Sequence, residues 1–216
     1  MNSSNYKSYC DELNDVIKNY PGLSVTERDN KKILKGILDI TNDDQNIIGH
    51  YLVEIHFSNG FPFRFPKLYE KGGAIPNHAD WHKYDDHRCC ITVLPDEIIK
   101  CKSGITIVEF IKRYCCSFFA NHIHRKLTGN YLNGEYSHGK EGLEEFYTEL
   151  LKTYDSKSWI KYIDHVFKGA IFSTERNDDC FCGSKDKFKK CHKLIFDKIW
   201  DIGRQQTVSD LKIILT

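Results

Sequence analysis

The sequence predicts an α+β fold in which an antiparallel sheet is followed by helices and by a small carboxyl-terminal module. Apolar residues recur at helical spacing near the amino terminus and again after residue 105. Between these stretches they alternate with polar residues at the period of two that is typical of half-buried strands. The order of helix, strands, long loop and helices describes a meander with helices packed on one side.

The amino-terminal half contains the first helix and the strands. A helix is expected over residues 6–20, because Pro21 and Gly22 end its apolar pattern. We expect strands over residues 32–40, 51–57 and, briefly, 67–70.

The stretch after these first strands has two irregular parts. The segment from Phe61 to Pro66 cannot be a central strand, because each of its prolines lacks an amide donor. Residues 72–90 show no clear period and are rich in His and Asp, which indicates a long loop with a polar function.

Helical periodicity returns in the second half of the chain. Helices are expected over residues 105–123, 141–154 and 158–168. After His192 the pattern is helical through Trp200 and then becomes ambiguous.

Composition indicates an ordinary globular protein and excludes some partners. Thirty-one Lys and Arg are balanced by thirty Asp and Glu, so we expect no nucleic acid as principal partner. The polar amino terminus does not resemble a signal peptide, and no apolar run approaches the roughly 20 residues that span a bilayer. We therefore expect a cytoplasmic protein that does not interact with membranes.

The nine cysteines call for more than one explanation. Without an export signal, a disulfide framework is not expected, because cytosolic thiols are kept reduced. Metal binding or nucleophilic chemistry explains them better. They fall into separate groups along the chain: Cys10; Cys89, Cys90 and Cys101; Cys115 and Cys116; and Cys180, Cys182 and Cys191.

The strand at 51–57, the Phe61–Pro66 crossing, the long loop and the run from Cys90 to Leu94 resemble the ubiquitin-conjugating family in order and spacing. The similarity covers roughly residues 5 to 155. It implies a ubiquitin-conjugating-like fold with an amino-terminal helix, a β-meander, an active-site loop and carboxyl-terminal helices. It also selects Cys90 as the catalytic cysteine. The family has a His-Pro-Asn triplet upstream of this cysteine, and here its place is taken by Asp80-Trp81-His82. Bacterial relatives similarly lack the asparagine.

The chemistry of such a site requires a thiolate. A free thiol with a pKa of about 8.5 is only partly ionised at neutral pH. His82, His87 and Arg88 can favour the thiolate, and His82 or a backbone amide can stabilise an oxyanion. The candidate catalytic residues are therefore Cys90, His82 and His87.

Several alternatives remain open for these residues. Cys90 can be a remnant in a fold that only binds partners, or a metal ligand together with His78, His82 and His87 in a hydrolytic site. Both loop histidines can equally be plain solvated residues. Cys101 is either a small buried residue or a second reactive thiol, and Cys89 is a buried residue or the true nucleophile. Cys115 and Cys116 lie in a predicted helix and are expected in its core.

The carboxyl-terminal cysteines form the most specific local pattern. Residues 180–184 and 187–192 resemble the SEC-C motif almost position for position. Two close thiols followed by an adjacent Cys-His pair can close a tetrahedral zinc site, so Cys180, Cys182, Cys191 and His192 are the expected ligands of a structural zinc ion. A redox-active or merely reduced cysteine cluster is the alternative. Lysines around the motif suggest a docking surface or a solvated face.

Together these resemblances imply two domains and an acyl-transfer function. Residues 1–168 would form the conjugating-like domain and residues 169–216 the zinc module with a terminal helix. Cys90 would carry the carboxyl terminus of a modifier or partner protein as a thioester and pass it to an amine. Such proteins occur in bacterial antiphage operons of the CBASS type, where the resemblance implies a cGAS-like nucleotidyltransferase as partner, and in ubiquitin-like modifier operons. No adenylation motif is visible, so a separate activating protein, or an unconventional direct complex with the partner, would deliver the acyl group. The competing hypothesis is a non-catalytic adaptor.

Overall fold

The computed structural model describes residues 12–29, 31–132, 136–152, 155–167, 175–180, 182 and 184–216. Within these ranges the chain packs as two units, which we treat separately. The sheet unit comprises the described residues of 1–92 and 103–135, and the helical unit those of 93–102 and 136–216. This division by packing does not coincide with the expected boundary after residue 168, and the two expected domains stay a prediction.

The sheet unit is built on a four-stranded antiparallel meander in the order β1-β2-β3-β4. The strands are β1 (Leu23–Arg28), β2 (Lys31–Thr41), β3 (Ile47–His56) and β4 (Lys67–Glu70). A helix over residues 12–19 precedes them. The expected helix at 6–20 is thus confirmed over residues 12–19, and its first residues lie outside the described part.

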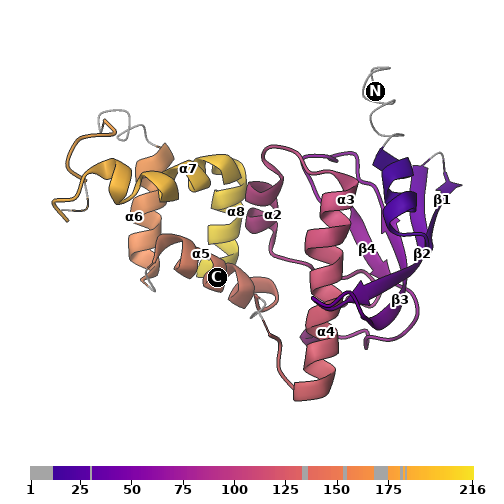
Figure 1. Ribbon diagram of the computed structural model, residues 1–216. Coiled ribbons are helices and arrows are strands. Elements are labelled where there is room, and N and C mark those ends of the chain that lie inside the picture. The colour runs from indigo at the N-terminus through magenta and orange to yellow at the C-terminus, as the bar shows by residue number, and fades with distance from the viewer. Residues whose placement is uncertain are drawn as a thin grey trace. The chain divides into compact units, whose positions relative to one another are not determined.

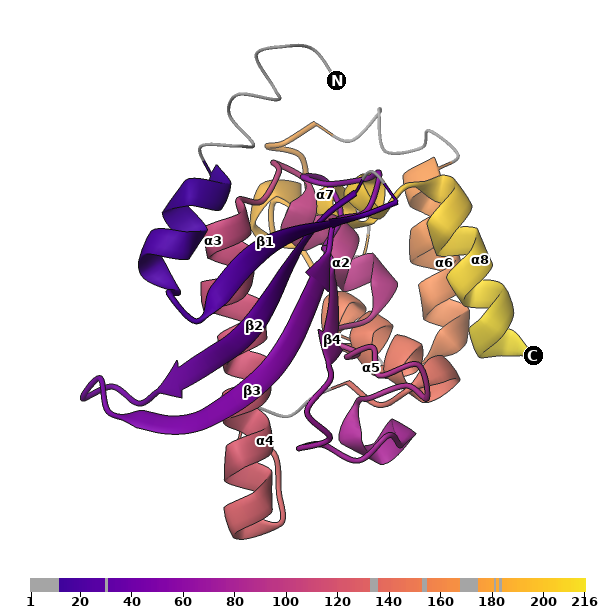
Figure 2. The same ribbon diagram turned by 90° about the vertical axis from the view of Figure 1, so that its right-hand side faces the viewer.

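One face of the meander is covered by a continuous helical segment, visible behind the strands in Figure 2. This segment consists of α3 (Ile107–Phe110), the π-helical turn η2 (Ile111–Cys115) and α4 (Cys116–Thr128). It begins where the Thr106 hydroxyl accepts a hydrogen bond from the Glu109 amide, and it ends at Gly129, whose φ of 85° suits glycine. The helix expected at 105–123 is confirmed and runs five residues further.

The core of the sheet unit follows from the alternation along the strands. Leu34, Leu38 and Ile40 of β2 point inwards and are buried, whereas Ile37 between them is 42% exposed. Opposite Leu38, Tyr51 of β3 stacks on Phe119 of α4 with ring centroids 4.1 Å apart. Each fully buried aliphatic side chain contributes about 1.5–3 kcal/mol, so this layer fixes α4 on the sheet.

The loop between β4 and α2 is irregular, as expected. It contains one short 3-10 helix, η1 (Ala79–Trp81), and isolated bridges that pair Tyr69 with Arg88 and Lys83 with Cys89. A buried ion pair between Lys83 and Glu70 anchors it, because the Lys83 ammonium also donates to the carbonyl of Ile75 at 2.9 Å. The loop is therefore tied to the edge of the sheet at β4.

The helical unit, shown in Figure 1, contains α2 (Leu94–Cys101), α5 (Gly139–Leu151), α6 (Ser156–Phe167), α7 (Lys193–Ile202) and α8 (Arg204–Leu215). A short 3-10 helix, η4 (Phe188–Lys190), precedes α7. The helices expected at 141–154 and 158–168 are confirmed within the described residues. The ambiguous end of the chain is helical.

A single hydrophobic core joins these helices to the cysteine-rich motif. Tyr147 and Trp159 of α5 and α6 are buried in the same cluster as Cys180 and Phe188 of the motif. The Tyr147 hydroxyl donates to the buried Asp210 carboxylate of α8 at 3.0 Å. The motif is thus part of the helical core.

Two elements were not predicted from the sequence. β1 is short and mostly exposed, so its apolar alternation is weak. α2 follows directly on the run from Cys90 and has Pro95 in its first turn, which suits a helix start. Among the described residues, no helix has the length and apolar character needed to cross a bilayer.

Candidate functional site

The two cysteines of the loop have opposite environments. Cys89 lies in the isolated bridge to Lys83 and is 6% exposed, and burial raises the pKa of its thiol far above the usual value. Cys90 is only half-buried. Successive residues of an extended segment point to opposite sides, so the backbone at Cys89 directs one thiol inwards and the next outwards.

Cys90 lies beside His82 and Tyr84. The Cys90 amide donates to the carbonyl of His82 at 2.8 Å, and an imidazole nitrogen of His82 lies within 4.8 Å of the Cys90 sulfur. The Tyr84 side chain is hydrogen-bonded to Cys90. Burial, followed by this hydrogen bond, raises the pKa of Tyr84 to about 12, so the phenol stays protonated and can donate to a Cys90 thiolate.

A tight hairpin presents Tyr84 to Cys90. The Tyr84 amide donates to the carbonyl of Arg88 at 2.9 Å, and the His87 amide donates to the carbonyl of Tyr84 at 2.9 Å. The Arg88 guanidinium lies 4.3 Å from the centroid of the Tyr84 ring. This turn places the phenol of Tyr84 near the thiol of Cys90. The sequence analysis did not select Tyr84.

The other loop histidines have different surroundings. His87 forms the hairpin turn at φ 69°, and its buried Nδ1 has no hydrogen-bond partner within the described part of the chain. His78 caps η1, where its Nδ1 accepts from the Asp80 amide at 3.2 Å. Among the described residues, neither histidine belongs to a group with Cys90 that is close enough to share one metal ion. The catalytic role of His87 stays a prediction.

Three other described cysteines, Cys101, Cys115 and Cys116, are fully or half-buried. Cys101 and Cys115 are fully buried, and burial raises the pKa of Cys115 well above its usual value. Cys116 is half-buried, and burial raises its pKa to about 11. The expectation that Cys115 lies in a helix core is confirmed.

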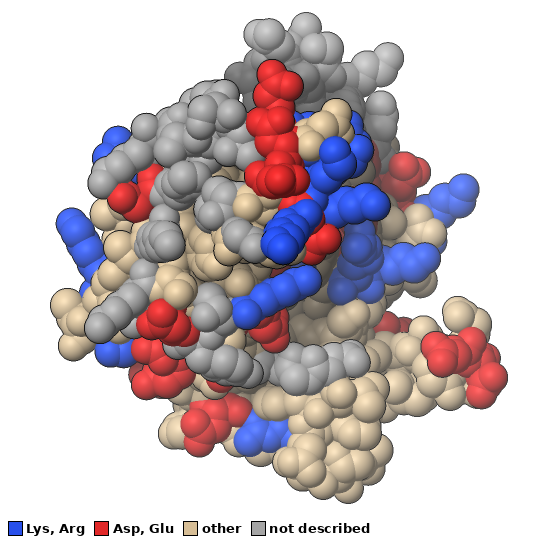
Figure 3. Space-filling view, turned by 90° about the vertical axis from the view of Figure 1, so that its left-hand side faces the viewer, with Lys and Arg blue, Asp and Glu red and all other residues tan. Residues whose placement is uncertain are grey.

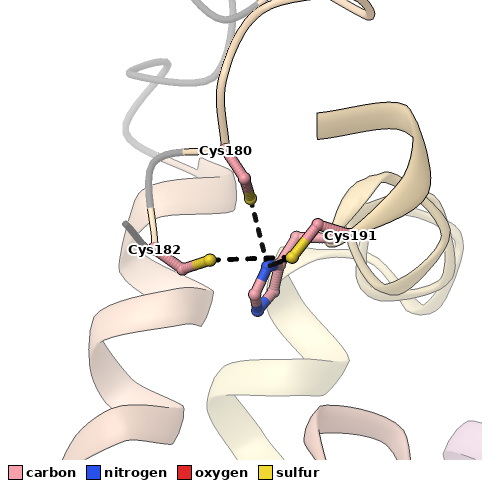
Figure 4. Close-up of side chains that lie close together, drawn as sticks. Cys180, Cys182 and Cys191 are labelled. Atoms are coloured by element: carbon pink, nitrogen blue, oxygen red, sulfur yellow. Dashed lines mark hydrogen bonds between the residues drawn. The ribbon is translucent and has the colours of Figure 1, made fainter. Parts of the chain in front are cut away.

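The carboxyl-terminal motif brings its four predicted ligands together. The Nδ1 atom of His192 lies 3.2 Å from the sulfur of Cys180 and 3.0 Å from that of Cys191. The sulfur atoms of Cys182 and Cys191 are 3.6 Å apart. Figure 4 shows the three cysteine side chains pointing towards a common centre.

The backbone explains this convergence. Asp179 pairs with Lys187 in an isolated bridge, and the Cys180 amide donates to the carbonyl of Asp186 at 2.7 Å. This pairing brings the first cysteine back to η4, after which Cys191 and His192 lead into α7. The sulfur atoms of the hairpin cysteines therefore face the Cys191 sulfur and the His192 nitrogen at the start of the helix.

The four residues form a group that can hold a metal ion. With Zn–S of about 2.3 Å and Zn–N of about 2.0 Å, the ligand atoms of a tetrahedral zinc site are about 3.5–3.8 Å apart. The contacts of 3.0 to 3.6 Å are slightly shorter, so only a small adjustment of the side chains is needed to hold the ion. Three thiols and one imidazole are also the donor set that suits structural zinc.

Ser184 and Tyr162 support this group and were not selected from the sequence. The Ser184 hydroxyl lies 3.5 Å from the Cys191 sulfur. Hydrogen bonding from Ser184 lowers the pKa of Cys182 to about 7, which favours the thiolate that a metal requires. The ring of Tyr162 in α6 packs against the imidazole of His192, with ring centroids 5.0 Å apart.

Lysines surround the motif. Lys185, Lys187, Lys189 and Lys190 are exposed, and Figure 3 shows Lys and Arg side chains gathered on this side of the molecule. Lys187 and Lys189 also donate to the backbone carbonyl and the side-chain oxygen of Asn177, at 3.1 and 2.8 Å. Part of the lysine run therefore braces the motif, and a docking role stays a prediction.

Comparison with known families identifies one local match. The family described as SEC-C motif, which is associated with zinc, matches residues 176–193 and so contains all four ligand candidates. No curated protein and no solved structure matches the chain.

Proposed function

We propose that the chain is a ubiquitin-conjugating-like acyl transferase whose Cys90 carries the carboxyl terminus of a protein as a thioester. The observation that supports this most is the split between the adjacent cysteines: Cys89 is buried, whereas Cys90 is half-buried beside His82 and Tyr84. The order of meander, long loop, cysteine and helices agrees with the resemblance.

The proposed reaction has two steps. The Cys90 thiolate attacks the carbonyl carbon of an activated carboxyl terminus, the thioester forms, and the activating group leaves. An amine then attacks the thioester carbonyl, the C–S bond breaks, the thiolate leaves, and the amine proton passes to solvent. A hydrogen bond from the Tyr84 phenol would stabilise the thiolate as nucleophile and as leaving group.

His82 has a separate role in this proposal. Its imidazole lies within 4.8 Å of the Cys90 sulfur, where a donor can stabilise the oxyanion of either tetrahedral intermediate. It would thus act in place of the asparagine that the resemblance expects. The partner is a modifier or a protein such as a cGAS-like nucleotidyltransferase, delivered by a separate activating protein in an antiphage operon.

We further propose that Cys180, Cys182, Cys191 and His192 hold one structural zinc ion. Zinc would supply a fixed crosslink between the motif hairpin and the start of α7. The support is the convergence of four ligand atoms within 4.8 Å of one another.

A synthetic peptide thioester that ends in Gly-Gly tests the acyl-transfer proposal without an activating protein. We expect an acyl adduct at Cys90, located by peptide mass spectrometry, that is released by dithiothreitol and consumed by lysine. The adduct should be lost in Cys90→Ala and kept in Cys89→Ala.

Two outcomes would contradict the proposal. If Cys89→Ala abolishes the adduct and Cys90→Ala does not, the nucleophile is Cys89. If folded wild-type protein forms no adduct at Cys90, the chain acts as an adaptor.

A further inference from the structure

The turn that carries His82 is held in an unusual conformation. His82 ends η1 with φ 48° and ψ 38°, the left-handed region that residues with a side chain seldom adopt. Its amide donates to the carbonyl of Ala79 at 2.7 Å. His82 is 7% exposed, and one of its imidazole nitrogens lies within 4.8 Å of the Cys90 sulfur. Contacts from elsewhere in the unit must therefore hold this turn.

Arg125 of α4 makes those contacts. Its guanidinium lies 4.1 Å from the ring centroid of Trp81 and 4.7 Å from that of Tyr131. The same group donates to the carbonyl of Asp80 and, at 2.8 Å, to the hydroxyl of Tyr131. One planar cation thus stacks on two rings and binds the carbonyl two residues before His82.

Tyr131 links Arg125 to His82. Its ring packs edge-on against His82 with centroids 5.2 Å apart, and its hydroxyl lies 3.4 Å from the Asp80 carbonyl oxygen. The Tyr131 ring also packs edge-on against His122, with ring centroids 5.3 Å apart. His122 is fully buried and packs on Phe118 with ring centroids 4.5 Å apart. It therefore supports the Tyr131 ring from the core.

From this geometry we infer that Arg125 is a positioning residue that holds His82 beside Cys90 through Asp80, Trp81 and Tyr131. The inference rests on the proposed function of Cys90 for its catalytic meaning. Arg125 does not act on the acyl group itself. A planar guanidinium is required, because an ammonium cannot stack on both rings and bind the carbonyl at the same time.

The test is the pH dependence of Cys90 alkylation by iodoacetamide, followed by peptide mass spectrometry. In Arg125→Met and in Arg125→Lys alike, we expect the midpoint to rise by about half a pH unit and the rate at pH 7 to fall about threefold, because a displaced His82 no longer favours the thiolate. Lys126→Met removes a neighbouring cation on the same helix and should leave the profile unchanged.

A variant of His82 separates positioning from general stability. In a His82→Gln background, Arg125→Met should cause no further shift, because the two substitutions affect one interaction. Thermal unfolding confirms that each variant is folded at the assay temperature. A purely structural role would lower the melting temperature and leave the alkylation profile of the folded protein unchanged.

Three results would overturn the inference: a normal profile in Arg125→Lys, which would make the effect one of charge alone; an equal shift in Lys126→Met; or additive shifts with His82→Gln. Alkylation needs no acyl donor, so it is independent of the proposed function. Normal alkylation in Arg125→Met with a normal peptide adduct removes the positioning role and leaves acyl transfer intact. A shifted profile without any adduct in wild-type protein removes acyl transfer and leaves the positioning of His82.

Discussion

The loop of the sheet unit and the motif of the helical unit each contain a pair of cysteine or histidine residues that are adjacent in sequence. The backbone directs the two side chains of a pair apart in the loop and together in the motif. At Cys89 and Cys90 an extended segment sends one thiol into the core and leaves the next half-buried. At Cys191 and His192 the chain enters a helix, and both side chains turn towards the thiols of a facing hairpin. Local backbone geometry therefore distinguishes a candidate nucleophile from a candidate metal site.

Loss of the proposed zinc ligands should have the largest effect. Structural zinc contributes roughly 10 kcal/mol or more to folding in small zinc domains. Because Cys180 and Phe188 share the core of α5 and α6, replacing Cys180 and Cys182 by Ala should expose the amides of both helices to hydrogen exchange. Metal analysis should find about one zinc per wild-type chain.

Cys116→Ser is the matched control for this pair of substitutions, since Cys116 is a half-buried thiol outside the group. It should keep both the metal and the protection of α5 and α6. A Cys180→Ala, Cys182→Ala protein that retains its zinc would refute the ligand set.

Selective alkylation measures the contrast within the loop. At pH 7.5 we expect iodoacetamide to modify Cys90 on the order of a hundred times faster than Cys89, because burial both shields Cys89 and raises the pKa of its thiol. Peptide mass spectrometry over time gives both rates, and unfolding in guanidinium should bring them close together. Comparable rates in the folded protein would contradict the assigned orientations.

The buried His122 should make the sheet unit sensitive to acid. Burial, together with the nearby His82, Arg125, Lys126 and Lys83, lowers the pKa of His122 from 6.5 to about 3. Below pH 6.5, His122 is therefore protonated in the unfolded chain but stays neutral in the folded chain. The free energy of unfolding falls as the pH drops from 6.5 towards 3. One such group gives a slope of about 1.4 kcal/mol per pH unit.

His122→Phe should reduce this slope by that amount. Denaturant unfolding of both proteins at several pH values, followed by tryptophan fluorescence and hydrogen exchange of α4, measures it. His124→Phe, two residues along the same helix, serves as the control. Identical slopes in the His122→Phe and wild-type proteins would show that His122 takes up its proton over this pH range in the folded state as well.

The smallest expected effect concerns Tyr84. Tyr84→Phe removes the phenol that is hydrogen-bonded to Cys90, so the pKa of Cys90 should rise and its alkylation at pH 7 should slow by a factor of about two to five. Tyr69→Phe, on β4 of the same unit, should have no such effect. Faster alkylation in Tyr84→Phe would mean that the ring mainly shields the thiol.

Much of the fold was predictable because periodicity reports burial directly. Strand β4 and the long helical segment after residue 105 were expected from their patterns. Strand β1 was missed because most of its residues are exposed, and α2 because eight residues give little more than two turns of pattern. Periodicity is informative only where one face of an element is buried over several turns.

The two sites differed in how far the sequence could describe them. The four candidate metal ligands lie within thirteen residues, so their spacing predicts convergence, and in the structure their ligand atoms come together. The turn that carries His82 is contacted by Arg125 and Tyr131, which come from distant parts of the chain and meet it only after folding. No local pattern marks such residues.

The most direct test of the central claim uses Cys90→Ser protein expressed in the cells that normally contain it. The account predicts an intact mass increased by that of a polypeptide joined through an ester to the introduced serine hydroxyl, a linkage that resists dithiothreitol and is cleaved by mild alkali. A folded, zinc-containing Cys90→Ser protein that shows only its own mass, while wild-type protein carries a thiol-sensitive adduct on another cysteine, would contradict the account.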